Sequence, residues 1–134
     1  MDDQTNFNRV LQDLIEMPPA RFDQQLKAAL PKAPGLYAIS MIGAPKGEYL
    51  YVGKTAKGAN GLRGRVWDQH YQTGGSSGDL IEKVKAKGYA RNAGEARRFI
   101  EQNCQVQWLE LKGDALRGWA EHHLLAALKP IWGS

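Results

Sequence analysis

Gly35-Leu36-Tyr37 and Tyr51-Val52-Gly53-Lys54 are the two stretches that decide the fold of this chain. Each places a tyrosine on a short β-prone run beside a glycine. The segment between them, residues 41–48, contains two glycines and a proline, which favour a turn. The sequence therefore predicts adjacent antiparallel strands over residues 35–41 and 49–53, with both tyrosines near one end. Two phenols beside a lysine in a basic chain indicate a site for a phosphate group.

Length and composition describe an ordinary globular domain. The chain has 134 residues, of which 43% are apolar, enough for one domain with a real core. Its single cysteine, Cys104, excludes an internal disulfide and a cysteine-based zinc site, and we interpret it as a buried strand thiol. The start is acidic and polar without a leader pattern, and no apolar run approaches transmembrane length. We therefore expect a cytoplasmic protein with no membrane partner.

The positive charge is concentrated in one third of the chain. Residues 54–98 contain ten Lys/Arg and four Asp/Glu, a net charge of +6, whereas residues 1–53 and 99–134 are each at −1. A localised basic excess is typical of proteins that bind a polyanion, nucleic acid first. The alternative is that the lysines at 83, 85 and 87 only solvate a helix.

Two helices are expected before the first strand, as an extension over residues 1–32 packed on a main domain at 33–134. The first has helical spacing of its apolar side chains and ends before Pro18-Pro19. Its apolar positions are Phe7, Val10, Leu11, Leu14 and Ile15. The second is short, with Phe22, Leu26, Ala29 and Leu30 on one face.

The remainder of the chain alternates helices with one more strand. We expect helices at about 62–71, 79–87, 93–102 and 114–129, and a strand at 104–111. On the last helix one apolar arc is predicted, formed by Leu116, Trp119, Ala120, His123, Leu124, Ala127 and Leu128. Glu121 lies at the border of that arc, a shielded yet reachable position that suits a metal ligand better than a solvated glutamate.

In this order and spacing the motifs resemble the GIY-YIG nuclease superfamily. The first motif is residues 35–37 and the second is residues 51–53, followed by Lys54. An arginine-bearing helix comes next, a late helix carries Glu121, and residues 128–132 are similar to the family's terminal motif. The resemblance covers about residues 33–133. It implies an α+β fold with a three-stranded antiparallel sheet flanked by helices, and an endonuclease that hydrolyses DNA with one Mg²⁺ or Mn²⁺ ion. RNA stays open as a substrate.

The resemblance also implies roles for individual side chains. Glu121 becomes the metal ligand, which is chemically adequate because Mg²⁺ takes few carboxylates and completes its shell with water and phosphate oxygens. Tyr37 and Tyr51 would position the attacking water, and one could accept its proton if nearby cations lower its pKa. Arg65 is the preferred phosphate-binding arginine and Arg63 its rival, because the two lie about 200° apart on a helix. The other phosphate-binding cations are Lys54 and Lys57.

Two positions differ from the family pattern. Gln69 stands where the family carries His or Tyr, and His70, one residue later, is turned away by about 100° unless the helix is irregular. His70 is thus a candidate for proton transfer. Gly133 stands where the family has asparagine. The second reading is therefore a catalytically weak or inactive nucleic-acid-binding module of the same fold. Target choice would come from the basic segment 54–98, the N-terminal helices, an oligomer or a partner.

Overall fold

A computed structural model describes residues 3–55, 60–73 and 79–133 of the chain. They form an α+β fold on one antiparallel sheet with strand order β1-β4-β2-β3. The strands are β1 (Ala20–Arg21), β2 (Gly35–Met41), β3 (Tyr51–Lys54) and β4 (Cys104–Glu110). The predicted α+β class is confirmed, but the predicted count of three strands is wrong. The fourth strand, β1, is two residues long, too short to show an alternating pattern, and exists only through its pairing with β4.

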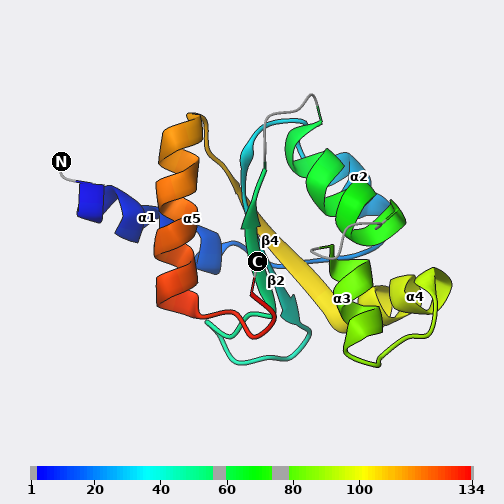
Figure 1. Ribbon diagram of the computed structural model, residues 1–134. Coiled ribbons are helices and arrows are strands. Elements are labelled where there is room, and N and C mark those ends of the chain that lie inside the picture. The colour runs from blue at the N-terminus through cyan, green and yellow to red at the C-terminus, as the bar shows by residue number, and fades with distance from the viewer. Residues whose placement is uncertain (1–2, 56–59, 74–78, 134) are drawn as a thin grey trace.

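Helices cover both faces of the sheet. They are α1 (Asp3–Glu16), α2 (Gln24–Ala29), η1 (Arg63–Thr73), α3 (Leu80–Ala86), α4 (Ala93–Asn103) and α5 (Asp114–Leu128). Figure 1 shows α1 and α5 on one side of the sheet, and α2, η1, α3 and α4 on the other. The buried apolar side chains fall into two clusters accordingly, one on each face. In the part of the chain described, no helix has the length and apolarity needed to span a membrane.

The two tyrosine stretches form neighbouring antiparallel strands, as predicted. The strand at 35–41 matches β2 residue for residue, whereas β3 begins at Tyr51, two residues later than expected. Tyr37 pairs with Gly53, and Tyr51 pairs with Ile39. Two register steps separate the tyrosines, so both point to the same face, toward η1 and α3.

The motif glycines are required by close approach of other atoms. A Cβ on Gly53 would lie 2.5 Å from the hydroxyl oxygen of Tyr37. A Cβ on Gly35 would lie 2.3 Å from the carbonyl oxygen of Leu109, across the pairing with β4. Both distances are too short for any real side chain, so glycine is needed to close the sheet around Tyr37.

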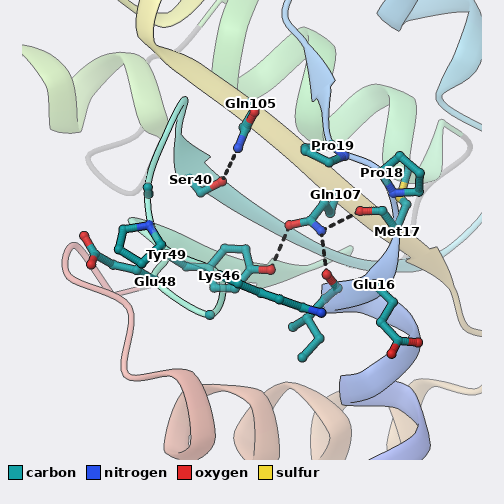
Figure 2. A pocket seen from close by; sticks show the side chains of 14 residues that line it. Glu16, Met17, Pro18, Pro19, Ser40, Lys46, Glu48, Tyr49, Gln105 and Gln107 are labelled. Carbon is teal, nitrogen blue, oxygen red and sulfur yellow. Dashed lines mark hydrogen bonds between the residues drawn. The ribbon is translucent and has the colours of Figure 1, made fainter.

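Gln107 of β4 ties the N-terminal segment to the sheet. Its Nε2 donates to the carbonyl oxygens of Ile15 (3.1 Å) and Met17 (2.6 Å), and its Oε1 accepts from the Tyr49 hydroxyl (2.8 Å). Figure 2 shows this side chain between Tyr49 and Met17, at the wall of a pocket of about 330 Å³. Tyr49 packs in the cluster with Leu14, on the face covered by α1 and α5. This pocket is therefore separate from Tyr37 and Tyr51, which pack in the other cluster.

The predicted apolar arc of the last helix is wrong in part. Leu116, Trp119 and Ala127 were expected inside, yet all three are exposed, Trp119 at 58%. The fully buried side of α5 carries Ala120 and Leu124, as predicted, together with Arg117, which was not predicted. Arg117 is buried because its guanidinium donates to the carbonyl oxygens of Thr55 (3.4 Å) and Leu111 (3.2 Å) and pairs with Asp114. These partners are supplied by the tertiary fold. A helical wheel that places every arginine in solvent therefore misplaces the centre of the buried face of α5.

Candidate active site

The tyrosine pair forms the centre of the candidate site. Tyr37 is fully buried and Tyr51 is 2% exposed. Their rings stack with centroids 6.1 Å apart and planes inclined by 11°. The ammonium of Lys83, from α3, lies 5.7 Å from the centroid of the Tyr51 ring. Two phenols and a cation are thus brought together from β2, β3 and α3.

The helix η1 is a π-helix, and this geometry decides which side chains reach the tyrosines. Hydrogen bonds in a π-helix join residues five apart, so positions i and i+5 share a face. Arg65 and His70 are such a pair. Arg65 Nε donates to the Tyr37 hydroxyl at 3.1 Å, and His70 Nε2 lies 2.7 Å from the same oxygen. In a regular α-helix His70 would be turned away from the site. The exception attached to that prediction, an irregular helix, is what the structure shows, and His70 reaches Tyr37.

The proton on His70 can be assigned from its second neighbour. The backbone N–H of Leu80 donates to Nδ1 at 2.8 Å, so Nδ1 is unprotonated. In the neutral ring the proton is therefore on Nε2 and is donated to Tyr37. Burial, followed by the charges of Arg65 and Lys83, lowers the pKa of His70 from 6.5 to about 3. His70 is therefore neutral at physiological pH, and both of its ring nitrogens take part in hydrogen bonds. This arrangement suits a residue that positions Tyr37.

Both phenols remain protonated in the protein by itself. Burial is the largest influence and raises the pKa of Tyr37 well above 10, and the neighbouring Tyr51 raises it further. Burial also raises the pKa of Tyr51. Arg65 lowers the pKa of both tyrosines, as the sequence suggested, but its effect is smaller than that of burial. Any step that ionises a phenol here needs additional positive charge.

Arg65 is held from two directions. Its Nε donates to Tyr37, while Nη1 contacts Gln69 Oε1 and lies 3.3 Å from the Asp79 carboxylate. The Asp79 side chain is 3% exposed, so the ion pair is well shielded on that side. Sequence reasoning assigned Asp79 only to the start of a helix. Its position before α3 gave no sign that it supports an arginine from η1.

The rival arginine is used elsewhere. Arg63 Nε donates to the carbonyl oxygen of Leu30 at 2.9 Å, and Nη2 donates to that of Ala28 at 3.4 Å. These carbonyls belong to the C-terminal end of α2, so Arg63 satisfies that helix end. Lys54 is exposed at the end of β3, next to Gly53. Lys57, predicted to bind phosphate, lies outside the described residues.

Glu121 of α5 lies within electrostatic reach of the site. The pKa of this half-buried carboxyl is raised by burial and lowered by the charges of Lys54, His122 and Arg65. Arg117 lies four residues earlier on the same helix, but its nitrogens are directed to Asp114 and two backbone carbonyls. Within the described ranges no three His, Cys, Asp or Glu side chains are grouped to hold a metal. A lone carboxylate still fits Mg²⁺, which accepts water and phosphate oxygens as its other ligands.

The end of the chain runs along β3, beside the tyrosine pair. Ile131 N–H donates to the Tyr49 carbonyl at 2.9 Å, and Trp132 N–H donates to the Leu50 carbonyl at 2.7 Å. Val52 N–H in turn donates to the carbonyl of Gly133 at 3.2 Å. Gly133 has a φ of +80°, which disfavours a side chain. Gly133, at the position where the family has asparagine, thus contacts the edge strand β3 through its backbone carbonyl and has no side chain to contribute.

Comparisons of the chain with protein-family models, with curated proteins and with solved structures find no match. The functional assignment accordingly depends on the motifs of the sequence and on the geometry of the site. Four of the predicted residues are in contact or stacked there: Tyr37, Tyr51, Arg65 and His70.

Proposed function

We propose that this protein is a divalent-metal-dependent endonuclease of the GIY-YIG type that hydrolyses phosphodiester bonds in DNA. The observation that carries the proposal is the convergence of Arg65 and His70 on the hydroxyl of Tyr37, next to Tyr51. A tyrosine that only fills a core does not require an arginine and a histidine on one oxygen. The net charge of +6 over residues 54–98 supports a polyanionic substrate.

Arg65 is assigned to the phosphate. Its Nε and Nη1 atoms are held by Tyr37 and Asp79, which fixes the plane of the guanidinium. A fixed guanidinium loses little entropy when its outer edge binds a phosphate oxygen. Lys54 is exposed at the end of β3 and adds a second positive charge. Together they would stabilise the negative charge that develops on the phosphorus oxygens.

The two phenols are assigned to the attacking water. His70 holds Tyr37 through Nε2, and the stacked ring of Tyr51 is held parallel to Tyr37. Because burial raises the pKa of both phenols, they orient a water by hydrogen bonding and do not remove its proton unaided. Glu121 would hold one Mg²⁺ or Mn²⁺ ion, which supplies Lewis-acid stabilisation of charge at the phosphate.

The test is nicking of supercoiled plasmid DNA with Mg²⁺ or Mn²⁺. We expect the wild-type protein to nick, chelation to stop the reaction, and Glu121→Gln to slow it by at least about 100-fold. Glu110→Gln is the matched control, since Glu110 is an exposed carboxylate at the end of β4. A panel of single-stranded, duplex, flap, junction and RNA substrates extends the test. If the wild type cleaves none of these with either metal, the non-catalytic nucleic-acid-binding module replaces the enzyme.

A further inference from the structure

An exposed aromatic ring lies on the molecule's basic segment, supported by two other rings. Tyr89, in the turn between α3 and α4, is 58% exposed. Its ring stacks on Phe99 of α4, with centroids 4.8 Å apart and planes inclined by 26°. The ring of Trp132 lies beside that of Tyr89, with the ring centroids 6.1 Å apart. Phe99 and Trp132 pack against the core cluster, so the rings that support Tyr89 are anchored while Tyr89 itself faces outward. We call these three residues the aromatic platform.

The aromatic platform is connected directly to the candidate active site. Trp132 donates its backbone N–H to the carbonyl of Leu50, the residue before Tyr51. Tyr89 donates its backbone N–H to the carbonyl of Val84 at 3.1 Å, and Lys83, the residue before Val84, lies over the Tyr51 ring. The platform is therefore linked to Tyr51 in two ways: through Leu50 of the chain before β3, and through the end of α3, which carries Lys83.

The surroundings of the platform are positively charged. Residues 80–99 contain six Lys/Arg and two Glu, a net charge of +4. Lys87 and Arg91 are exposed two residues to either side of Tyr89. Exposed aromatic faces combined with cations that follow a backbone are the means by which proteins bind single-stranded nucleic acid. We favour a nucleic acid over a peptide or a lipid because the ring and the cations lie next to the site proposed for a phosphodiester.

We propose that the aromatic platform is a stacking subsite for an unpaired base of the nucleic acid whose backbone enters the active site. A base inside a duplex is stacked on a neighbouring base at each of its two faces, so it has no free face that could stack on Tyr89. The preferred ligand is therefore a strand with at least one unpaired nucleotide, such as a single strand, a flap or a frayed end. The position of the base relative to the cleaved bond rests on the proposed nuclease function; the stacking itself does not.

Binding without cleavage tests the subsite. The probe is a fluorescently labelled oligothymidylate, titrated in chelator with proteins that all carry Glu121→Gln, and Kd is measured by anisotropy. We expect Tyr89→Ala to weaken binding by about 5-fold to 150-fold, and Tyr89→Phe, which keeps the ring, to stay within about 2-fold. Trp119→Ala is the matched control, because Trp119 is also 58% exposed but lies on α5, across the sheet. It should leave Kd unchanged.

A spectroscopic readout separates stacking from a structural effect. A strand containing 2-aminopurine should lose fluorescence on binding to the Tyr89→Phe protein and keep it with Tyr89→Ala. Wild-type affinity of Tyr89→Ala for the single strand, or an equal loss of affinity for a closed-circular duplex that has no ends, overturns the proposal. If Tyr89→Ala weakens single-strand binding although the wild type nicks nothing, the subsite stands and the nuclease fails. If the wild type nicks DNA but Tyr89→Ala binds the single strand as tightly as the wild type does, the nuclease stands and the subsite fails.

Discussion

The Nε2 atom of His70 lies 2.7 Å from the hydroxyl oxygen of Tyr37, and the other ring nitrogen accepts the backbone N–H of Leu80. One imidazole thus joins η1 to the central strand β2 and to the start of α3. The contact exists because η1 is π-helical, which places His70 on the face of Arg65, five residues earlier. π-helical turns occur frequently at functional sites, and here the turn assembles the polar centre of the candidate site.

Stability should depend on pH through His70. The folded protein does not protonate His70 until about pH 3, whereas the unfolded chain does so near pH 6.5. Between these values the unfolded state binds more protons, so this contribution to stability is present above pH 6.5 and is lost as the pH falls. The free energy of unfolding should fall by up to about 1.4 kcal/mol per pH unit from this group. Urea unfolding at a series of pH values measures the slope.

Two variants control the pH experiment. His70→Asn can keep an acceptor for the Leu80 N–H but cannot titrate, so its slope should be shallower than that of the wild type. His122→Asn changes an exposed histidine and should leave the wild-type slope intact. Identical slopes for the wild type and His70→Asn would contradict the assignment.

Two glycine-to-alanine changes should have opposite effects on stability. Gly53→Ala places a methyl group where the Tyr37 hydroxyl lies 2.5 Å away, so we expect a loss of about 1–3 kcal/mol in the free energy of unfolding and a damaged active site. Gly118→Ala lies in α5, where among the described residues no atom outside the helix's own backbone comes within 4 Å of the added carbon, and should gain about 0.5–1 kcal/mol. Urea denaturation compares the pair. A Gly53→Ala protein as stable as the wild type would contradict the close approach.

The two arginines of η1 should separate catalysis from folding. Arg65→Lys cannot contact Tyr37 and Asp79 at once, so we expect nicking to slow by about 100-fold. Arg63→Lys loses only bonds to carbonyls at the end of α2, and should cost about 1 kcal/mol of stability with normal nicking. Single-turnover nicking and urea unfolding on both proteins give the comparison. An equal loss of nicking in the two variants would exclude a special role for Arg65.

Local sequence patterns were sufficient for most elements. The strand at 35–41, the helix beginning at Ala93 and the helix beginning at Asp114 begin where the patterns indicate. In these segments the residues that specify the element are its own: alternation for a strand, helical spacing and caps for a helix. The order of motifs also named Tyr37, Tyr51 and Arg65 as one group, and the structure brings these three together.

The features that were missed have partners far away in the sequence. β1 is a strand only because β4 pairs with it. Arg117 is buried only because Thr55 and Leu111 present carbonyl oxygens to it. Asp79 supports Arg65 across a gap of fourteen residues. No periodicity of two or 3.6 residues records such contacts.

The sequence by itself determined which residue types are available to the site and where its strands lie, because glycine, turn residues and alternation act over a few neighbours. Tertiary structure alone decided that His70 reaches Tyr37, since that requires η1 to be π-helical and Leu80 to supply a hydrogen bond. It also decided the raised pKa of both phenols. That shift arises from burial among segments distant in the chain, whereas the nearby charge of Arg65 acts in the opposite direction.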